Sequence, residues 1–83
     1  SGQQGFLRLS VLLRTTKDGE AAIDRERQRL RLAIYNVLLN TQVEAISVEE
    51  KQEPVCQELQ KLLNTVLGKE YILGVKFIRV LIV

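Results

Sequence analysis

The sequence predicts a small α+β domain of the form βααβ, in which two helices pack on an antiparallel or mixed sheet. Near both ends of the chain, apolar residues alternate with polar residues, which is typical of half-buried strands. Between the ends, apolar residues recur every three or four positions, which is typical of amphipathic helices. A chain of 83 residues, of which 46% are hydrophobic, has the size and composition of one domain with one core.

The start of the chain divides into a short lead and a strand. Ser1 and Gly2 are typical of a remnant left by tag removal. Residues 1–5 are therefore expected to be such a remnant or a disordered lead, and residues 6–83 to form a single domain. The first strand is expected over residues 6–15, followed by an Asp-Gly turn. Its inward face would hold Leu7, Leu9, Val11 and Leu13.

The first helix is expected between Glu20 and Asn40, as one helix of about five turns. Its apolar stripe is interrupted only where Arg27 occupies a position expected to be apolar. A second apolar strip on another side of the same helix consists of Leu32, Tyr35 and Leu39. This half of the helix is therefore expected either to be buried on two sides or to contribute to an interface.

The second helix is expected to begin with Pro54 in its first turn and to end near Leu67, with Gly68 as its C-terminal stop. Proline is tolerated in a first turn because its missing N–H has no intrahelical partner there. An earlier start, at the capping pattern from Ser47, would place this proline inside the helix. Residues 41–53 are therefore expected to form an irregular or one-turn connection.

The last strand is expected over residues 71–83, because β-branched and aromatic residues predominate there. Val75 and Phe77 are two positions apart and so face the same side of a regular strand, whereas Val80, three positions beyond Phe77, faces the opposite side. The inward face is therefore expected to switch near Ile78, as a β-bulge would produce. The predicted core consists of the inward positions of all elements, namely Leu9, Val11, Ile34, Leu38, Leu59, Leu63, Val75 and Phe77.

The composition argues against catalysis. The sequence contains no histidine, so the commonest general base and zinc ligand is missing. Cys56 is the one strong nucleophile, but Glu53 and Glu58 flank it, and we interpret it as a small hydrophobic residue on a packed helix face. The acidic cluster formed by Glu49, Glu50 and Glu53 lacks the glycine-centred pattern of a calcium loop. We therefore expect no enzymatic activity, no cofactor and no bound metal.

Charged residues are the most unusual local feature of the first helix, which carries Arg25, Arg27, Arg29 and Arg31 at alternate positions. Asp24 and Glu26 can pair with these arginines, so a salt-bridged exposed helix is expected, with contact to a partner as the alternative. The RNA-binding KH fold also joins two helices to a sheet. However, the connection over residues 41–53 is acidic and has no glycine, so we do not expect nucleic acid as a partner.

The order of these elements resembles the periplasmic domain of the FliL family of flagellar basal-body proteins. The resemblance covers nearly the whole chain and rests on the segments LRLAIYNVLLN, QELQKLLNTVLG and VKFIRVLIV. Its most family-like positions are Leu30, Ala33, Ile34, Leu38, Leu39, Leu59, Leu63, Asn64, Leu67, Gly68, Val75 and Phe77. The chain departs from the family in two places: Lys51 lacks the glycine that commonly precedes it, and residues 80–83 stay apolar.

The resemblance implies a non-catalytic accessory domain of the flagellar motor, similar in fold to stomatin-type domains. Such a domain forms homo-oligomers, including rings, and contacts stator proteins to support motility. The resemblance also implies an upstream membrane helix outside this sequence and a location at the periplasmic face of the bacterial inner membrane. The alternatives are an interaction module of another secretion or envelope complex, and a cytoplasmic adaptor or KH-like nucleic-acid-binding domain.

The distribution of charge suggests how copies of the chain would meet. The arginine-rich helix start and the acidic connection are unbalanced in opposite senses and are expected to take part in self-association or partner contact. If they lie on different sides of the domain, identical copies can associate head to tail. The apolar strip would then lie at the centre of the contact. The candidate interface residues are Arg27, Arg31, Leu32, Tyr35, Leu39, Glu50 and Glu53.

Overall fold

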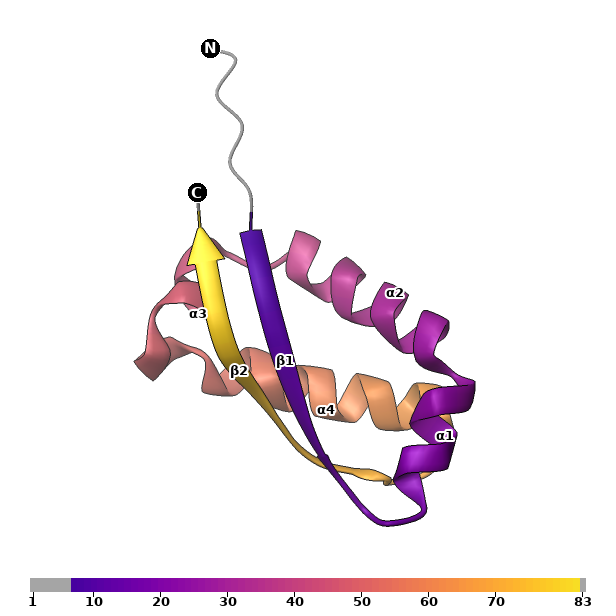
Figure 1. Ribbon diagram of the computed structural model, residues 1–83. Coiled ribbons are helices and arrows are strands. Elements are labelled where there is room, and N and C mark those ends of the chain that lie inside the picture. The colour runs from indigo at the N-terminus through magenta and orange to yellow at the C-terminus, as the bar shows by residue number, and fades with distance from the viewer. Residues whose placement is uncertain (1–6, 83) are drawn as a thin grey trace.

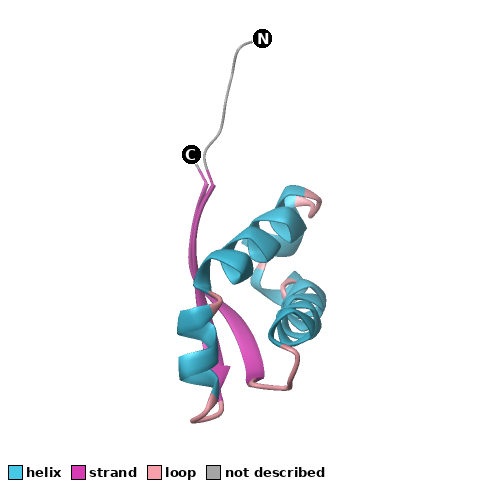
Figure 2. Ribbon diagram, turned by 90° about the vertical axis from the view of Figure 1, so that its right-hand side faces the viewer, coloured by secondary structure: helices cyan, strands magenta, loops and turns pink. Residues whose placement is uncertain are grey.

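The computed structural model describes residues 7–82, so the predicted lead over residues 1–5 lies outside the described residues, as do Phe6 and Val83. The predicted α+β class is confirmed: two strands form an antiparallel ribbon, and α2 and α4 lie on the same side of it (Figures 1 and 2). The elements are β1 (Leu7–Thr15), α1 (Gly19–Arg25), α2 (Arg27–Leu39), α3 (Val43–Ser47), the 3₁₀ helix η1 (Glu49–Lys51), α4 (Glu53–Leu67) and β2 (Ile72–Ile82).

The two strands are paired along their whole length, from Leu7 opposite Ile82 to Thr15 opposite Ile72. The register slips by one residue at two places in β2, where Ile78 and Leu73 have no partner residue in β1. The slip at Ile78 confirms the predicted bulge, whereas the slip at Leu73 was not predicted.

The two bulges keep the apolar residues of β2 on one face. β1 alternates regularly, but the inward residues of β2 are spaced by three, two and three positions, so two extra residues are needed to keep the faces aligned. The inward pairs are Leu9 with Val80, Val11 with Phe77, Leu13 with Val75, and Thr15 with Ile72. At the end of β1, Leu7 was also expected to face inward, but it is 45% exposed.

The prediction of one helix from Glu20 to Asn40 is wrong, because Glu26 separates α1 from α2. Glu26 has φ −107° and ψ 19°, although backbone hydrogen bonds continue across it. Ala22 and Leu30 are the buried side chains of the two segments. Eight positions on a straight helix correspond to a rotation of about 80°, so the break lets both residues face the interior. The change of direction between α1 and α2 is visible in Figure 1.

The second half of the chain follows the prediction more closely. The connection contains the one-turn helix α3 and then η1, in agreement with the predicted irregular or one-turn connection. α4 begins with Pro54 in its first turn. It ends at Leu67, where Gly68 has φ 78° and donates its N–H to the Asn64 carbonyl oxygen at 2.9 Å. This left-handed position favours glycine, so the predicted stop is confirmed.

The core consists of two adjoining clusters between the ribbon and α4. One contains Leu59 and Phe77, and the other contains Leu63 together with Leu30 and Ile72. α4 packs on β2, and α2 packs on α4. Of the predicted core, Leu59, Leu63 and Phe77 are buried, whereas Leu9, Val11, Ile34, Leu38 and Val75 are partly buried against these clusters. The prediction omitted the buried residues Leu30, Ile46 and Ile72.

Candidate protein-interaction surface

Three large apolar side chains form an exposed strip on α2, which we call the apolar strip. Leu32, Tyr35 and Leu39 expose 62%, 60% and 65% of their surface. Their spacing of three and four positions places them on one side of the helix, roughly opposite the buried Leu30. Of the two options that the sequence left open, burial on two sides is therefore wrong for the described residues. An interface is the remaining option.

The arginines of α1 and α2 are partly neutralised by carboxylates of the same helical segment. Arg27 Nη2 lies 2.6 Å from Asp24 Oδ1, and Arg29 Nη1 lies 3.1 Å from Glu26 Oε2, which confirms the predicted salt bridges. Exposed pairs of this kind contribute roughly a few tenths of a kcal/mol each. Arg31 has no carboxylate within ion-pair distance among residues 7–82. Its charge is therefore available to a partner.

The acidic members of the predicted interface lie elsewhere on the molecule. Glu50 is in η1 and Glu53 is the first residue of α4, and both are exposed. The start of α2 and the junction between η1 and α4 lie at opposite sides of the molecule in Figure 1. The seven predicted interface residues therefore belong to two separate surfaces. Five lie on α2 and two at the junction.

An apolar groove between β1 and α2 adjoins the apolar strip and was not predicted. Its volume is about 440 Å³. β1 contributes three partly buried side chains, because α4 packs against β2 rather than over β1. Tyr35 belongs to both the groove and the apolar strip. The main lining residues are Leu9, Val11 and Leu13 from β1, and Arg27, Arg31, Ile34, Tyr35 and Leu38 from α2.

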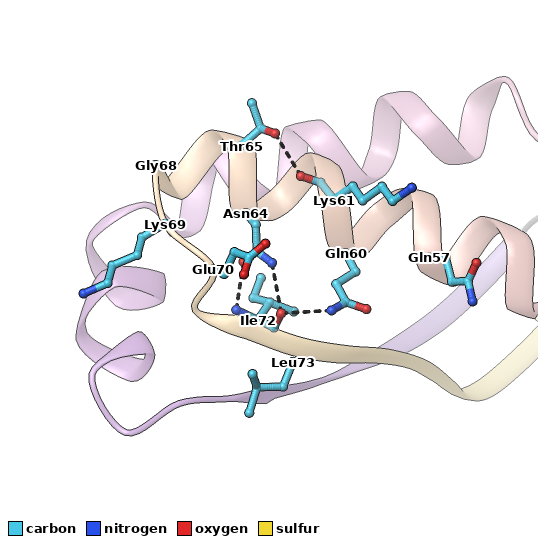
Figure 3. A pocket seen from close by; sticks show the side chains of 10 residues that line it. All are labelled: Gln57, Gln60, Lys61, Asn64, Thr65, Gly68, Lys69, Glu70, Ile72 and Leu73. Carbon is cyan, nitrogen blue, oxygen red and sulfur yellow. Dashed lines mark hydrogen bonds between the residues drawn. The ribbon is translucent and has the colours of Figure 1, made fainter.

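A second hollow, of about 830 Å³, lies between α4 and the start of β2 (Figure 3). Its polar side chains are largely engaged within the protein. Asn64 Oδ1 accepts a hydrogen bond from the Ile72 N–H at 2.8 Å, and Asn64 Nδ2 donates to the Ile72 carbonyl oxygen at 3.0 Å. Gln60 Nε2 donates to the same oxygen at 3.2 Å. We interpret this hollow as the seam that fixes β2 to α4.

Cys56 lies on the buried side of α4, in the cluster that contains Leu59 and Phe77. Its predicted placement on a packed helix face is therefore confirmed. Burial raises the pKa of the thiol above its ordinary value of 9.0, and the nearby charge of Glu53 raises it further, whereas a backbone hydrogen bond from Phe77 lowers it in part. The thiol is consequently protonated at neutral pH, unlike an activated nucleophile.

Two further properties of residues 7–82 bear on the kind of site that the chain offers. No group of three or more histidine, cysteine, aspartate or glutamate side chains is arranged there to hold a metal ion. Over the same range, none of the helices combines the length and the apolar character that crossing a membrane requires.

Comparisons of the chain with protein families, with curated proteins and with solved structures find no match. The evidence for a function therefore comes from the residues and their geometry. Three features contribute to it: the apolar strip on α2, the opposite charges at two sides of the molecule, and the groove between β1 and α2.

Proposed function

We propose that this chain is a non-catalytic interaction domain of the FliL type, which self-associates and contacts stator proteins of the flagellar motor to support motility. The observation that carries the proposal is the exposed apolar strip on α2, with Arg27 and Arg31 beside it. Aromatic and arginine side chains around an apolar centre are enriched in protein interfaces. Three large exposed side chains on one helix face favour a covering partner.

The separation of charge supports head-to-tail association of identical copies. Arg27 and Arg31 lie near the start of α2, and Glu50 and Glu53 lie at the opposite side of the molecule. One copy therefore offers a cationic surface where the next copy offers an anionic one. Such heterologous contacts close into rings when the rotation between copies allows it. The charges would set register and encounter rate, and the apolar strip would supply most of the affinity.

The flagellar assignment rests on the sequence resemblance, and the fold gives several family-like positions a physical role. Leu59 and Leu63 fill the core, Gly68 ends α4, and Asn64 fixes the start of β2. In this proposal the domain lies at the periplasmic face of the bacterial inner membrane, where a membrane helix outside this sequence holds it. Stator proteins are its partners there.

Charge reversal tests the proposal. In the variant Arg27→Glu with Arg31→Glu, we expect self-association, measured by sedimentation velocity, to weaken about tenfold or more, equivalent to about 1.4 kcal/mol. The matched control is Arg25→Glu with Arg29→Glu, which changes the net charge equally on another side of the helices. Further substitution with Glu50→Lys and Glu53→Lys should restore association.

A motility assay separates the remaining outcomes. The same variants would replace the FliL gene of a flagellated bacterium, and swimming would be measured in soft agar. Loss of swimming with Arg27→Glu and Arg31→Glu, without rescue by the two lysines, would identify another protein as the partner of α2. If every variant stays monomeric and swims as the parent does, the arginines are only a solvated face.

A further inference from the structure

β1 has an edge without a strand partner in the part of the chain that the structure describes, because the sheet there consists of β1 and β2. Just beyond β1, the Thr16 N–H donates to the Tyr71 carbonyl oxygen at 2.9 Å, so the backbone groups of Thr16 point toward β2. Backbone groups alternate in direction along a strand. The N–H and C=O groups of Leu9, Val11 and Leu13 therefore point away from β2, toward the open edge.

The hydrogen bonds of Ile72 support this assignment independently. Ile72 lies opposite Thr15, yet its N–H and C=O bond to the side chain of Asn64 rather than to β1. Thr15 and Ile72 are thus a non-hydrogen-bonded pair: the backbone groups of Thr15 point away from β2, and those of Ile72 point away from β1. The same interaction shows that the edge of β2 is occupied at its start, where α4 supplies the partner groups.

Of the usual features that block strand addition, the edge of β1 has charged side chains, Arg8 and Arg14, and lacks the others. Proteins commonly protect an edge with a proline, a bulge, a very short strand or a covering element. β1 is nine residues long, contains no proline, and has both register slips on its partner strand. Its neighbour on the open side is the apolar groove, and Figure 1 shows α2 on this side of the ribbon.

The groove gives an added strand a place for its side chains. Alternate residues of a strand paired with β1 would face the same side as Leu9, Val11 and Leu13. There they would meet Ile34 and Leu38 of α2, which line the groove from the opposite wall. These positions therefore favour aliphatic residues at every second position of the occupant.

The charges around the edge favour an acidic occupant. Arg27 and Arg31 line the groove, and Arg8 and Arg14 are exposed on the other face of β1, where Arg14 Nη2 also donates to the Leu73 carbonyl oxygen at 3.2 Å. A second copy of β1 fits poorly, because antiparallel pairing centred on Val11 would place Arg8 of one copy opposite Arg14 of the other. Like charges directly opposite one another destabilise a strand pair. A strand that carries carboxylates on the face away from the groove instead complements Arg8 and Arg14.

We propose that the β1 edge and the adjoining groove bind an extended segment of a partner protein, in which apolar residues alternate with aspartate or glutamate. The segment adds a third strand to the ribbon through the backbone groups of Leu9, Val11 and Leu13. Its apolar side chains fill the groove, and its carboxylates face Arg8 and Arg14. This docking mode does not depend on the flagellar assignment or on the head-to-tail contact.

A capped octapeptide of alternating valine and glutamate tests the docking site on the full chain. Binding is followed by nuclear magnetic resonance of the ¹⁵N-labelled protein. We expect shifts and slower amide exchange at Leu9, Val11 and Leu13, and about tenfold weaker binding of a valine-lysine peptide. In a paired peptide strand, the N–H groups of alternate residues face β1 and the others face away. N-methylation of the alternate residues that face β1 should therefore abolish binding, whereas N-methylation of the other residues should preserve it.

A protein variant tests the contribution of the arginine side chains to peptide binding. Arg8→Gln should weaken binding of the valine-glutamate peptide, whereas the matched control Arg25→Gln should not. The proposal is overturned if methylation at both sets of alternate positions leaves binding unchanged, or if the shifted amides lie outside β1. It is equally overturned if these amides are already protected without peptide. If the protection of these amides from exchange increases with protein concentration, a second copy of the chain occupies the edge. If the protection is the same at all dilutions, another part of the same chain occupies it.

Discussion

The side chain of Asn64 bonds to both backbone groups of Ile72, at 2.8 Å to its N–H and 3.0 Å to its carbonyl oxygen. The helical residue thereby takes the place that a neighbouring strand would have at this end of β2. Ile72 is 1% exposed while the Asn64 side chain covers its backbone groups at the edge of the hollow between α4 and β2. A buried donor or acceptor without a partner costs about 1–3 kcal/mol.

Asn64→Ala should therefore lower the free energy of unfolding by about 1–3 kcal/mol. Urea denaturation followed by circular dichroism at the helical band measures this change, since the chain has no tryptophan. Gln57→Ala is the matched control on the same helix, because Gln57 is exposed and bonds only to Glu53. Equal midpoints for the two variants would show that the Asn64 bonds are not needed to hold β2.

Two leucines of the predicted core should differ in their contribution to stability. Leu63 is fully buried, whereas Leu38 is partly buried beside the groove. Leu63→Ala should cost about 2–5 kcal/mol, and Leu38→Ala should cost clearly less, because part of its surface already meets solvent. The same denaturation assay compares them. A cost for Leu38→Ala as large as that for Leu63→Ala would mean that the groove is filled in solution.

Two glycines offer a paired test of backbone packing. A Cβ atom on Gly19 would lie 3.0 Å from Tyr71 Cβ and 3.2 Å from Thr16 Oγ1, whereas one on Gly74 would approach nothing closer than the Arg14 guanidinium at 3.5 Å. Gly19→Ala should destabilise the domain by about 1–3 kcal/mol through overpacking. Gly74→Ala should be neutral or stabilise it by up to about 1 kcal/mol, since it restricts the unfolded chain. Thermal denaturation of both variants decides; loss of stability with Gly74→Ala alone would contradict this packing.

Cys56 should make stability fall at alkaline pH. The folded state raises the pKa of its thiol, so it keeps a proton that the unfolded state loses as the pH rises through the ordinary value of 9.0. Because the unfolded state then binds fewer protons, the free energy of unfolding decreases with pH above that value and is unaffected well below it. Cys56→Ala should remove this part of the fall between pH 8 and pH 10.5, as measured by urea denaturation at each pH.

The same thiol should also react slowly. Iodoacetamide at neutral pH should modify Cys56 more slowly than free cysteine, because the thiolate is scarce and the side chain is buried. A faster reaction would contradict the interpretation of this residue as inert. It would also reopen the question of catalysis.

The features that were predicted correctly are those fixed by local chemistry. Pro54 lacks a donor and so belongs in a first turn, and Gly68 occupies the left-handed position that ends α4. The bulge at Ile78 follows from parity, because Phe77 and Val80 cannot face the same side without an extra residue. Each of these conclusions needs only neighbours along the chain.

The features that were missed depend on where elements lie in space. Both backbone groups of Glu26 keep helical hydrogen bonds, to Ala22 and from Leu30, and neither proline nor glycine marks the break. Its local sign is Arg27, at a position expected to be apolar. The break reflects the separate anchoring of Ala22 and Leu30. The groove was missed for a related reason: alternation shows which side of β1 faces inward, but not whether a helix covers that side. The burial of Ile46 was missed because α3 is too short for its apolar residues to show a helical period.

The pairing of Leu7 with Ile82 has a consequence for the growing chain on the ribosome. β1 is synthesised first and β2 last, yet within the described residues each is the other's only strand partner. The ribbon therefore cannot close until translation of the whole domain is complete. During that interval the nascent segment LRLSVLLRT has no complementary strand. Arg8 and Arg14, which interrupt its apolar residues, then act as gatekeepers that discourage premature aggregation with other emerging chains.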